Sequence, residues 1–302
     1  MRKENYPLVS IVLTTYKGTD CVRRCLESAY NQEYPNIEII IVDDNGKGTD
    51  DQENTFKAIS DFLFHKNIIY IAHEKNSNGS VSRNTGIKKA SGEYVAFLDD
   101  DDVLYKDSIS QRVEALLRKD DGYAFVLTSY RTIRTGFLDE NVILDFDGDI
   151  LEEYLKKKYQ SPSSVILAKK SAIEKIGFWD ETFLRHQDWE FLARMSFVFK
   201  GCSVKKVTVD KYVLQRNYPS NPDVFRDRRL HYLNTVKKCM VNLSPRAQKE
   251  ILYLHYYDIA KEYFKGKKII QCFKWCSKSG NPIRAIFSIL KDGFDFLIKK
   301  TR

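Results

Sequence analysis

Blocks of apolar and polar residues alternate along the first 130 residues and predict strands and helices in turn. Short apolar runs rich in Ile and Val predict strands over residues 8–15, 37–42, 68–72, 94–98 and 123–127. The stretches between them predict helices over 20–32, 49–64, 80–90 and 107–118. This βαβα order indicates an α/β fold, a Rossmann-like and mostly parallel twisted sheet flanked by helices.

The remainder of the chain divides into a mixed segment and a helical one. Strands are expected over 163–169 and 204–214, and a helix over 187–199. From residue 222 the pattern is helical, with breaks at 244–245, 265–266 and 280–282. We therefore expect one domain over 1–220, with a first half over about 1–130 and a second half over about 131–220. Residues 221–302 form a helical C-terminal region.

No apolar run is long enough to span a bilayer, and the run near the start lacks a signal-peptide cleavage site. We expect a cytoplasmic protein, or one peripheral to the inner face of the cell membrane. The net charge of +8 suggests an anionic partner. The basic residues form no motif that reads nucleic acid, so none is expected. The six cysteines lack zinc-site spacing and are expected to be reduced thiols.

Polar residues follow three of the predicted strands. The first strand runs into Thr14 and Tyr16, the second into Asp43 and Asp44, and the fourth into the aspartates 99–102. In an open α/β sheet, ligands bind beyond the carboxyl ends of the strands. Tyr16 offers an aromatic surface for a nucleobase, and a carboxylate can accept a hydrogen bond from a base N–H.

The row of four aspartates, Asp99, Asp100, Asp101 and Asp102, is the strongest signal in the sequence. Adjacent carboxylates repel each other, and a divalent cation such as Mg²⁺ or Mn²⁺ relieves that repulsion. Such a cation can also hold phosphates. The alternative is an acidic helix N-terminus, because a helix follows at Asp107, although four aspartates exceed what a cap needs.

Two further segments contribute candidate residues. Residues 78–86 open a helix with Gly and Ser, so its N–H groups can meet an anion, with Arg83 near the base or the phosphates, or can simply be capped. At the start of the helix over 187–199, Asp188 is either a cap or a general base. His186 competes for the role of base because its ordinary pKa lies near neutrality.

Four segments together resemble glycosyltransferase family 2, which has the GT-A fold. They are VSIVLTTYKG, IEIIIVDDNGKGTDD, NGSVSRNTGIKKASGEYVAFLDDDDVLY and IGFWDETFLRHQDWEFLAR, and the resemblance covers about residues 7–217. The segments lie in the order and at the spacing of the family. The resemblance implies that 1–220 is a GT-A catalytic domain, with a nucleotide-binding half over about 1–130 and an acceptor half over about 131–220.

The resemblance implies a role for each matching position in nucleotide-sugar binding. Thr14 and Tyr16 resemble the nucleobase pocket, with Tyr16 stacking on the ring. Asp43 and Asp44 resemble the carboxylates at the base, and Arg83 resembles a further contact. The aspartate row resembles the DxD motif, in which Asp99 and Asp100 lie near the ribose and the metal ion, and Asp101, with Asp99, binds that ion.

At the acceptor side, the resemblance makes Asp188 the catalytic base. Trp189 and Glu190 frame the acceptor, and His186 is a further candidate contact to the acceptor or donor. Relatives often carry a metal-binding histidine after the last strand, but residues 212–217 contain none. Arg216 is therefore a candidate for neutralising the diphosphate.

The function implied is an inverting, metal-dependent transfer of a hexose from a UDP-sugar to an acceptor hydroxyl. A lipid-diphosphate-linked saccharide in bacterial surface polysaccharide synthesis is the expected acceptor. The alternatives are a nucleotidyltransferase, for which the sequence lacks a Gly-rich phosphate loop, and a non-catalytic nucleotide-sugar-binding protein. The basic, aromatic-rich C-terminal helices either lie on an anionic membrane surface or pack with a solvated basic face.

Overall fold

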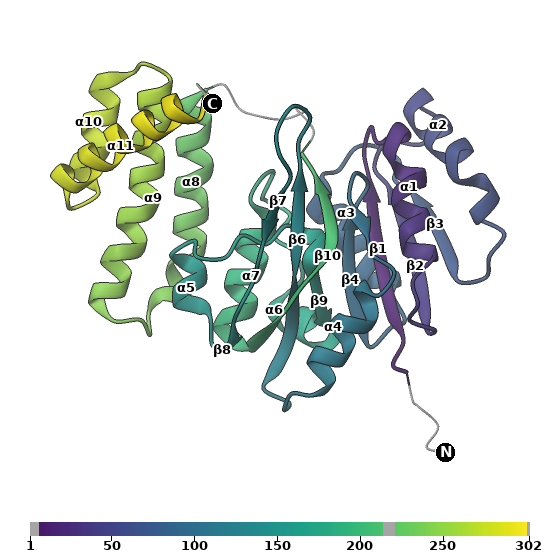
Figure 1. Ribbon diagram of the computed structural model, residues 1–302. Helices are drawn as coiled ribbons and strands as arrows, with labels where there is room; N and C mark the ends of the chain where they lie inside the picture. Colours follow the sequence, from purple (N-terminus) through teal and green to yellow (C-terminus); the bar gives the residue numbers. More distant parts are fainter. Residues whose placement is uncertain (1–5, 214–220, 301–302) are drawn as a thin grey trace. The chain divides into compact units, whose positions relative to one another are not determined.

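The computed structural model describes residues 6–213 and 221–300, with side chains through residue 292 (Figure 1). The chain forms two compact units. The first, here called the sheet unit, comprises Met1–Ile150 and Tyr159–Leu214. The second, the helical unit, comprises Leu151–Lys158 and Gln215–Arg302. The sequence division had placed residues 151–158 in the acceptor half of the first domain.

The sheet unit is built on one mixed sheet with the strand order β3-β2-β1-β4-β9-β6-β10-β5. The strands β1 to β4 run parallel, β9 lies antiparallel between β4 and β6, and β10 is parallel to β6. Two short strands, β7 and β8, pair with β6 and β10. The strands are β1 (Val9–Thr15), β2 (Ile37–Asp43), β3 (Ile68–Ala72), β4 (Tyr94–Asp99), β5 (Val103–Leu104), β6 (Tyr123–Ile133), β7 (Glu140–Val142), β8 (Asp147–Gly148), β9 (Ile166–Lys169) and β10 (Lys200–Tyr212).

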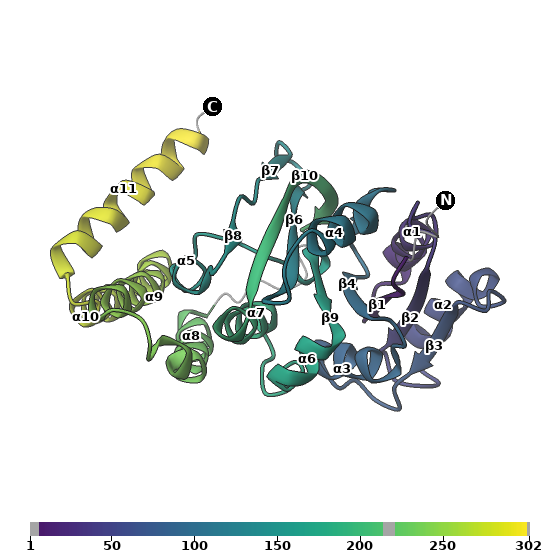
Figure 2. The same ribbon diagram turned by 90° about the horizontal axis from the view of Figure 1, so that it is seen from below.

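Helices cover both faces of this sheet, with α1 and α4 on one side and α3, α6 and α7 on the other (Figure 2). The central strands are apolar on both faces for this reason, and Ile39, Ile40, Ile41 and Val42 are all fully buried. The helices are α1 (Thr19–Tyr30), α2 (Asp50–Ile59), α3 (Gly79–Lys89), α4 (Ser108–Leu117), α6 (Lys170–Ile176) and α7 (Gln187–Val198), with 3-10 turns η1 (Ser60–Phe62) and η2 (Ser163–Val165).

The predicted mostly parallel sheet is confirmed, and the differences are local. The strand expected over 163–169 begins with the turn η2, so only Ile166–Lys169 pairs in the sheet. The strand expected over 123–127 extends to Ile133 as β6 because it pairs with β10 along its whole length. All six cysteines are free, as expected.

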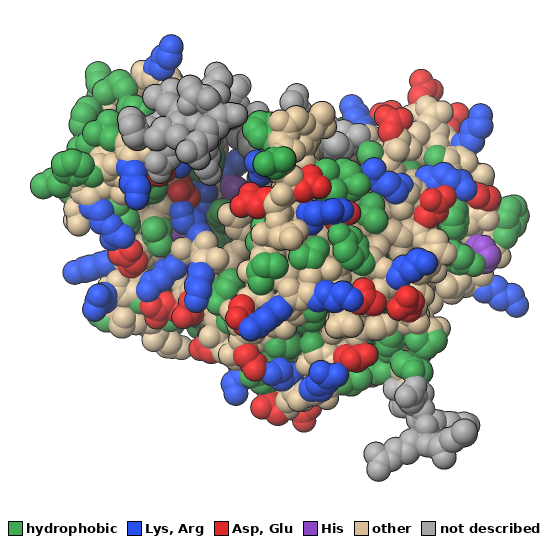
Figure 3. Space-filling view, viewed as in Figure 1, with side chains coloured by type: hydrophobic (Ala, Val, Ile, Leu, Met, Phe, Trp, Pro, Cys, Tyr) green, Lys and Arg blue, Asp and Glu red, His purple; other side chains and the backbone are tan. Residues whose placement is uncertain are grey.

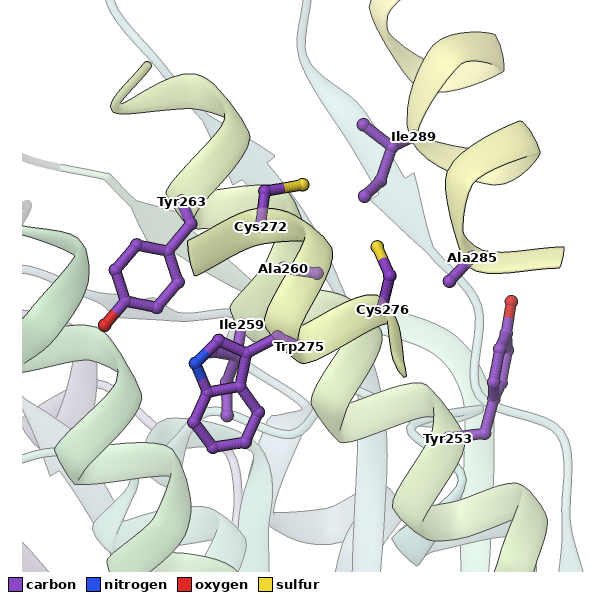
Figure 4. Close-up of a cluster of buried hydrophobic side chains, with 9 residues drawn as sticks. All are labelled: Tyr253, Ile259, Ala260, Tyr263, Cys272, Trp275, Cys276, Ala285 and Ile289. Carbon is purple, nitrogen blue, oxygen red and sulfur yellow. The ribbon is translucent and has the colours of Figure 1, made fainter. Parts of the chain in front are cut away.

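The helical unit consists of α5 (Leu151–Leu155), α8 (Pro222–Val236), the turn η4 (Lys237–Met240), α9 (Pro245–Lys265), α10 (Ile269–Lys278) and α11 (Pro282–Lys300). The helices break where the sequence predicts, and the Ser244 hydroxyl caps α9 by accepting from the Ala247 N–H at 3.1 Å. Its core packs Tyr263, Trp275, Cys276 and Ile289 together (Figure 4).

Polar contacts explain why residues 151–158 group with the helical unit. Lys157 donates a 2.7 Å hydrogen bond to Asp258 of α9, and the ring nitrogen Nε2 of His255 lies 3.0 Å from the Leu155 carbonyl. Among the described residues, no helix is both long and apolar enough to cross a bilayer.

Candidate functional site

The parallel strands bring the predicted polar clusters to one edge of the sheet. In the strand register, Thr15 lies beside Asp43, and Thr14 lies beside Asp99. Strand β9 runs the opposite way, so the turn η2 that precedes it reaches the same edge. This edge therefore combines the ends of β1, β2 and β4 with the start of β9.

Asp99 is held by groups from two other elements. One carboxylate oxygen accepts from Arg83 of α3 at 2.6 Å, and the other accepts from the Ser163 hydroxyl at 2.7 Å. Burial raises the pKa of Asp99, but Arg83, Lys211 and these hydrogen bonds outweigh it and hold the pKa below its ordinary value. Asp99 is therefore ionised at neutral pH, with its side chain 26% exposed.

Arg83 is a partner of Asp99 and has little freedom to contact a base. Its guanidinium also donates to Gln187 at 2.8 Å and to Ser163 at 3.0 Å, and it lies 4.8 Å from the ring centroid of Trp179. The residue is 8% exposed. Arg83 thus joins α3, α7 and η2 at the edge of the sheet.

Asp100 points to the end of β1. It accepts from the Thr15 hydroxyl at 2.7 Å and from the Tyr16 N–H at 3.1 Å. A Cβ at Gly18 would lie 1.8 Å from its Oδ2 atom, so this close approach requires glycine. Burial, assisted by the charges of Asp101 and Asp99, raises the pKa of Asp100 to about 7. Asp100 thus fixes the turn that carries Tyr16.

Asp102 points inward like Asp100. Its side chain is fully buried and accepts from the Ser164 hydroxyl at 2.6 Å and the Tyr212 N–H at 3.1 Å. Asp99 and Asp101 are partly exposed. The row therefore alternates, and the two members that can face a ligand are Asp99 and Asp101.

The alternation bears on the expected metal ion. Among the described residues, no group of three or more His, Cys, Asp or Glu side chains is arranged to hold a metal. Mg²⁺, however, is commonly bound by one or two carboxylates together with substrate phosphates and water. The pair Asp99 and Asp101 fits an ion of that kind, for which phosphates and water would complete the set of ligands.

The two aspartates at the end of β2 are engaged in hydrogen bonds. Asp43 is fully buried and accepts from the Tyr70 hydroxyl at 2.7 Å, and burial raises its pKa. Asp44 lies 2.7 Å from His73 and accepts from the Asn76 side chain at 2.9 Å. It also accepts from the backbone N–H groups of residues 77 and 78, at 2.9 and 3.0 Å. Asp44 therefore anchors residues 73–78, and a base N–H would have to replace one of these bonds.

Thr14 and Tyr16 are accessible at this edge. Thr14 is partly exposed, and the ring of Tyr16 is 47% exposed with the Lys17 ammonium 5.5 Å from its centroid. Tyr16 therefore offers a free aromatic face beside the aspartate row. Arg216 lies outside the described residues.

Helix α7 brings Asp188 to the site at its first turn. Its Oδ1 atom accepts from the Trp189 N–H at 3.0 Å. Burial raises the pKa of Asp188 to about 6, while Arg83 and Lys211 act in the opposite direction. A carboxylate with a pKa near 6 is ionised at neutral pH and can take a proton from a hydroxyl group.

The residues beside Asp188 differ in accessibility. His186 has a positive φ of 59°, and its ring lies 4.7 Å from that of Trp189. Both are partly exposed. Glu190, by contrast, is 1% exposed and pairs through both oxygens with Arg194. The prediction that Glu190 frames the acceptor is therefore not supported, because the carboxylate faces the interior.

Several residues of the site were not identified from the sequence. They are His73, Ser163, Ser164, Gln187 and Lys211. Ser163 and Ser164 come from a segment about 65 residues from their partners, at a turn that the strand-like pattern concealed. Lys211 lies one residue before the stretch 212–217, in which relatives often carry a histidine. A lysine near the end of a predicted strand does not by itself indicate a binding site.

Comparison with known proteins places the chain in a family. Residues 10–172 match Glycosyl transferase family 2, and the chain belongs to this family. The sequence is 31% identical over 192 residues to the amylovoran biosynthesis glycosyltransferase AmsB of Erwinia amylovora, covering 61% of this chain and 62% of AmsB. The chain spans smaller shares of the next relatives.

Solved structures confirm the GT-A fold. The mannosyltransferase PcManGT of Pyrobaculum calidifontis, in complex with GDP-Man and Mn²⁺, has a TM-score of 0.63 at 18% identity, covering 98% of this chain and 81% of that one. S. aureus TarS 1-349, in complex with UDP-GlcNAc, has a TM-score of 0.59 at 15% identity, covering 84% of this chain and 81% of TarS.

Proposed function

We propose that the protein is an inverting glycosyltransferase that moves a hexose from a UDP-sugar to an acceptor hydroxyl. The observation that carries this proposal is the meeting of three groups at one sheet edge: the free face of Tyr16, the partly exposed aspartates Asp99 and Asp101, and the base candidate Asp188. Family membership supports it. AmsB acts in amylovoran biosynthesis, which suggests a saccharide acceptor, here a lipid-diphosphate-linked one in bacterial surface polysaccharide synthesis.

Each group has a task in a single displacement. Tyr16 stacks on the uracil ring beside Thr14, and Asp43 and Asp44 shape the wall behind it. Asp99 and Asp101 would hold Mg²⁺ or Mn²⁺, which supplies positive charge for the phosphates. The acceptor oxygen bonds to the anomeric carbon, and its proton passes to Asp188. The bond from that carbon to the diphosphate oxygen breaks on the opposite side, so the configuration inverts.

The donor is tested first. The full chain is screened by thermal shift against UDP-glucose, UDP-galactose, their N-acetyl forms and GDP-mannose, each with and without Mn²⁺. A UDP-sugar is expected to raise the melting temperature most, because TarS is known with UDP-GlcNAc. PcManGT is known with GDP-Man, so a larger shift with GDP-mannose would overturn the choice of nucleotide. Shifts from no nucleotide sugar would overturn the proposed function.

The helical unit is proposed to dock on an anionic membrane at the inner face of the cell membrane. Helices α10 and α11 expose large apolar side chains, including Ile270 at 83%, Phe273 at 53% and Phe287 at 69%. Hydrophobic side chains gather at the surface of the helical unit in Figure 3. Lysines Lys267 and Lys274 are exposed beside them. Exposed apolar groups flanked by lysine are typical of helices that lie in a lipid interface.

Co-sedimentation with phosphatidylglycerol vesicles tests the docking. The double substitution Ile270→Glu and Phe287→Glu is expected to lower the bound fraction severalfold, because each glutamate removes apolar area and is repelled by the lipid. The control is Gln271→Glu on an exposed position of α10, which changes charge without removing apolar area. An equal loss in the control, or no loss in the double variant, would count against docking through this surface.

A further inference from the structure

Lys211 occupies a position in the candidate site that no sequence motif indicated. It is the penultimate residue of β10, and its side chain is 27% exposed. The Nζ atom lies 3.7 Å from Oδ2 of Asp102. An ammonium group carries three N–H donors, yet Lys211 donates no hydrogen bond to any residue that the structure describes. All three donors are therefore available to a ligand.

The charges around Lys211 are unusual for a surface lysine. Burial lowers its pKa, but neighbouring carboxylates more than offset this and the pKa is raised. The carboxylates are those of Asp102, Asp99, Asp101 and Asp188. Lys211 in turn acts to lower the pKa of Asp99 and of Asp188. Its ammonium is thus permanently charged and lies within the field of both the aspartate row and the base candidate.

Pairing with Asp102 does not account for this placement. Both oxygens of Asp102 already accept, from the Ser164 hydroxyl and the Tyr212 N–H. The distance of 3.7 Å from Lys211 is also longer than a hydrogen bond. Lysines at two other positions of β10 behave differently, because Lys205 and Lys206 lie 2.7 and 2.6 Å from the carboxylates of Asp145 and Asp107.

Arg83, a second cation beside the aspartate row, is already occupied. Both terminal nitrogens of Arg83 donate to side chains, at 2.6 to 3.0 Å from their acceptors. Arg83 is therefore a structural member of the site. Lys211, by contrast, lies among the carboxylates of the site with its donors unused by any described residue.

We propose that Lys211 is a built-in cation for the nucleoside diphosphate, which supplies part of the positive charge that a divalent ion would otherwise provide alone. This inference rests on the proposed function. When the bond from the anomeric carbon to the diphosphate oxygen breaks, negative charge grows on that oxygen. The Lys211 ammonium donates hydrogen bonds to the diphosphate and stabilises it without changing its own protonation. Nucleoside diphosphate binding therefore keeps a component that needs no metal.

Calorimetric titration of the full-length protein with UDP tests this directly, in EDTA and again in Mn²⁺. The wild type is expected to bind UDP measurably in EDTA and more tightly in Mn²⁺. Lys211→Met should weaken binding in EDTA by about tenfold or more, because a desolvated charge-assisted contact is lost, whereas Lys211→Arg should retain most of it. Asp101→Asn should instead lose the increment that Mn²⁺ provides and keep the binding seen in EDTA.

Matched controls separate binding from folding. Lys206→Met removes an exposed lysine of the same strand and should leave UDP affinity unchanged in both buffers. Lys211→Met leaves the aspartate row with less compensation and can reduce stability. The double variant Lys211→Met and Asp102→Asn restores the charge balance, while the introduced amide can still bond to Ser164, and its folding is checked by thermal unfolding.

The outcomes distinguish this inference from the function on which it rests. If a folded Lys211→Met variant, single or double, binds UDP in EDTA as tightly as the wild type, the inference is wrong. Binding by the wild type only in Mn²⁺ also overturns it and leaves the proposed function standing. Failure of the wild type to bind any nucleoside diphosphate in either buffer removes both.

Discussion

The sheet unit and the helical unit differ in where their charged side chains lie. In the sheet unit, several carboxylates of the candidate site are buried and accept hydrogen bonds. Asp102, for example, accepts from Ser164 and Tyr212. In the described part of the helical unit, most Lys and Arg side chains are exposed, and so are apolar rings such as Phe273. Buried charges are costly unless each is compensated, so they mark a place where position matters more than stability. Surface charges cost little free energy because water solvates them, and an excess of positive ones attracts anionic partners in general.

The largest effect is expected from Asp188→Asn in the sheet unit. The amide cannot accept the proton of the acceptor hydroxyl, so kcat should fall by roughly 10²–10⁴-fold. UDP release from the donor in the presence of acceptor measures kcat, and calorimetry with UDP shows that donor binding is retained. Normal transfer by a variant that still binds UDP would remove Asp188 from the role of base.

A second large effect concerns stability. Arg194→Met leaves the buried carboxylate of Glu190 without its partner and should lower the free energy of unfolding by about 3–5 kcal/mol. Chemical denaturation monitored by tryptophan fluorescence measures the loss. Adding Glu190→Gln to this variant removes the unpaired charge and should restore part of the stability. No restoration would mean that the Arg194 bonds to the Ile176 and Phe178 carbonyls dominate.

The pH profile tests the same comparison, because Asp188 is a partly buried carboxylate with a pKa of about 6. The base works only when it is ionised, so activity is present above pH 6 and is lost as the pH falls through this value. Below it, kcat/KM should fall about tenfold per pH unit. The rate is measured between pH 4.5 and 8 with binding followed in parallel. A profile that stays flat to pH 4.5 would contradict the role of Asp188.

The smallest effect is expected at the surface of the helical unit. Lys265 and Glu262 form an exposed pair at 2.6 Å on α9. Lys265→Ala should cost only about 0.2–0.5 kcal/mol in the free energy of unfolding, because water already solvates both charges. A loss of unfolding free energy as large as that of Arg194→Met would contradict the difference between buried and exposed ion pairs in the two units.

Sequence reasoning predicted the elements and the edge of the site because both follow from local pattern. Parallel strands end at the same edge, so the polar residues after β1, β2 and β4 had to meet there. The direction of each aspartate could not be predicted in this way. It depends on partners far along the chain, such as Ser163, Ser164 and Lys211.

The sequence does contain a signal that Glu190 forms an ion pair within its own helix. Arg194 lies four residues later on the same helix, a spacing at which opposite charges pair. The grouping of residues 151–158 with the helical unit left no comparable trace. It rests on contacts of Lys157 and Leu155 with α9, which are about 100 residues away.

The alternation along the four aspartates has a consequence for how this segment can change in evolution. Replacing Asp99 or Asp101 changes which ligands the row can bind, while Asp100 and Asp102 still hold the backbone through their hydrogen bonds. Removing or inserting a single residue within the row would instead exchange inside for outside at the aspartates that follow the change. The row should therefore tolerate amino-acid substitutions far better than insertions or deletions.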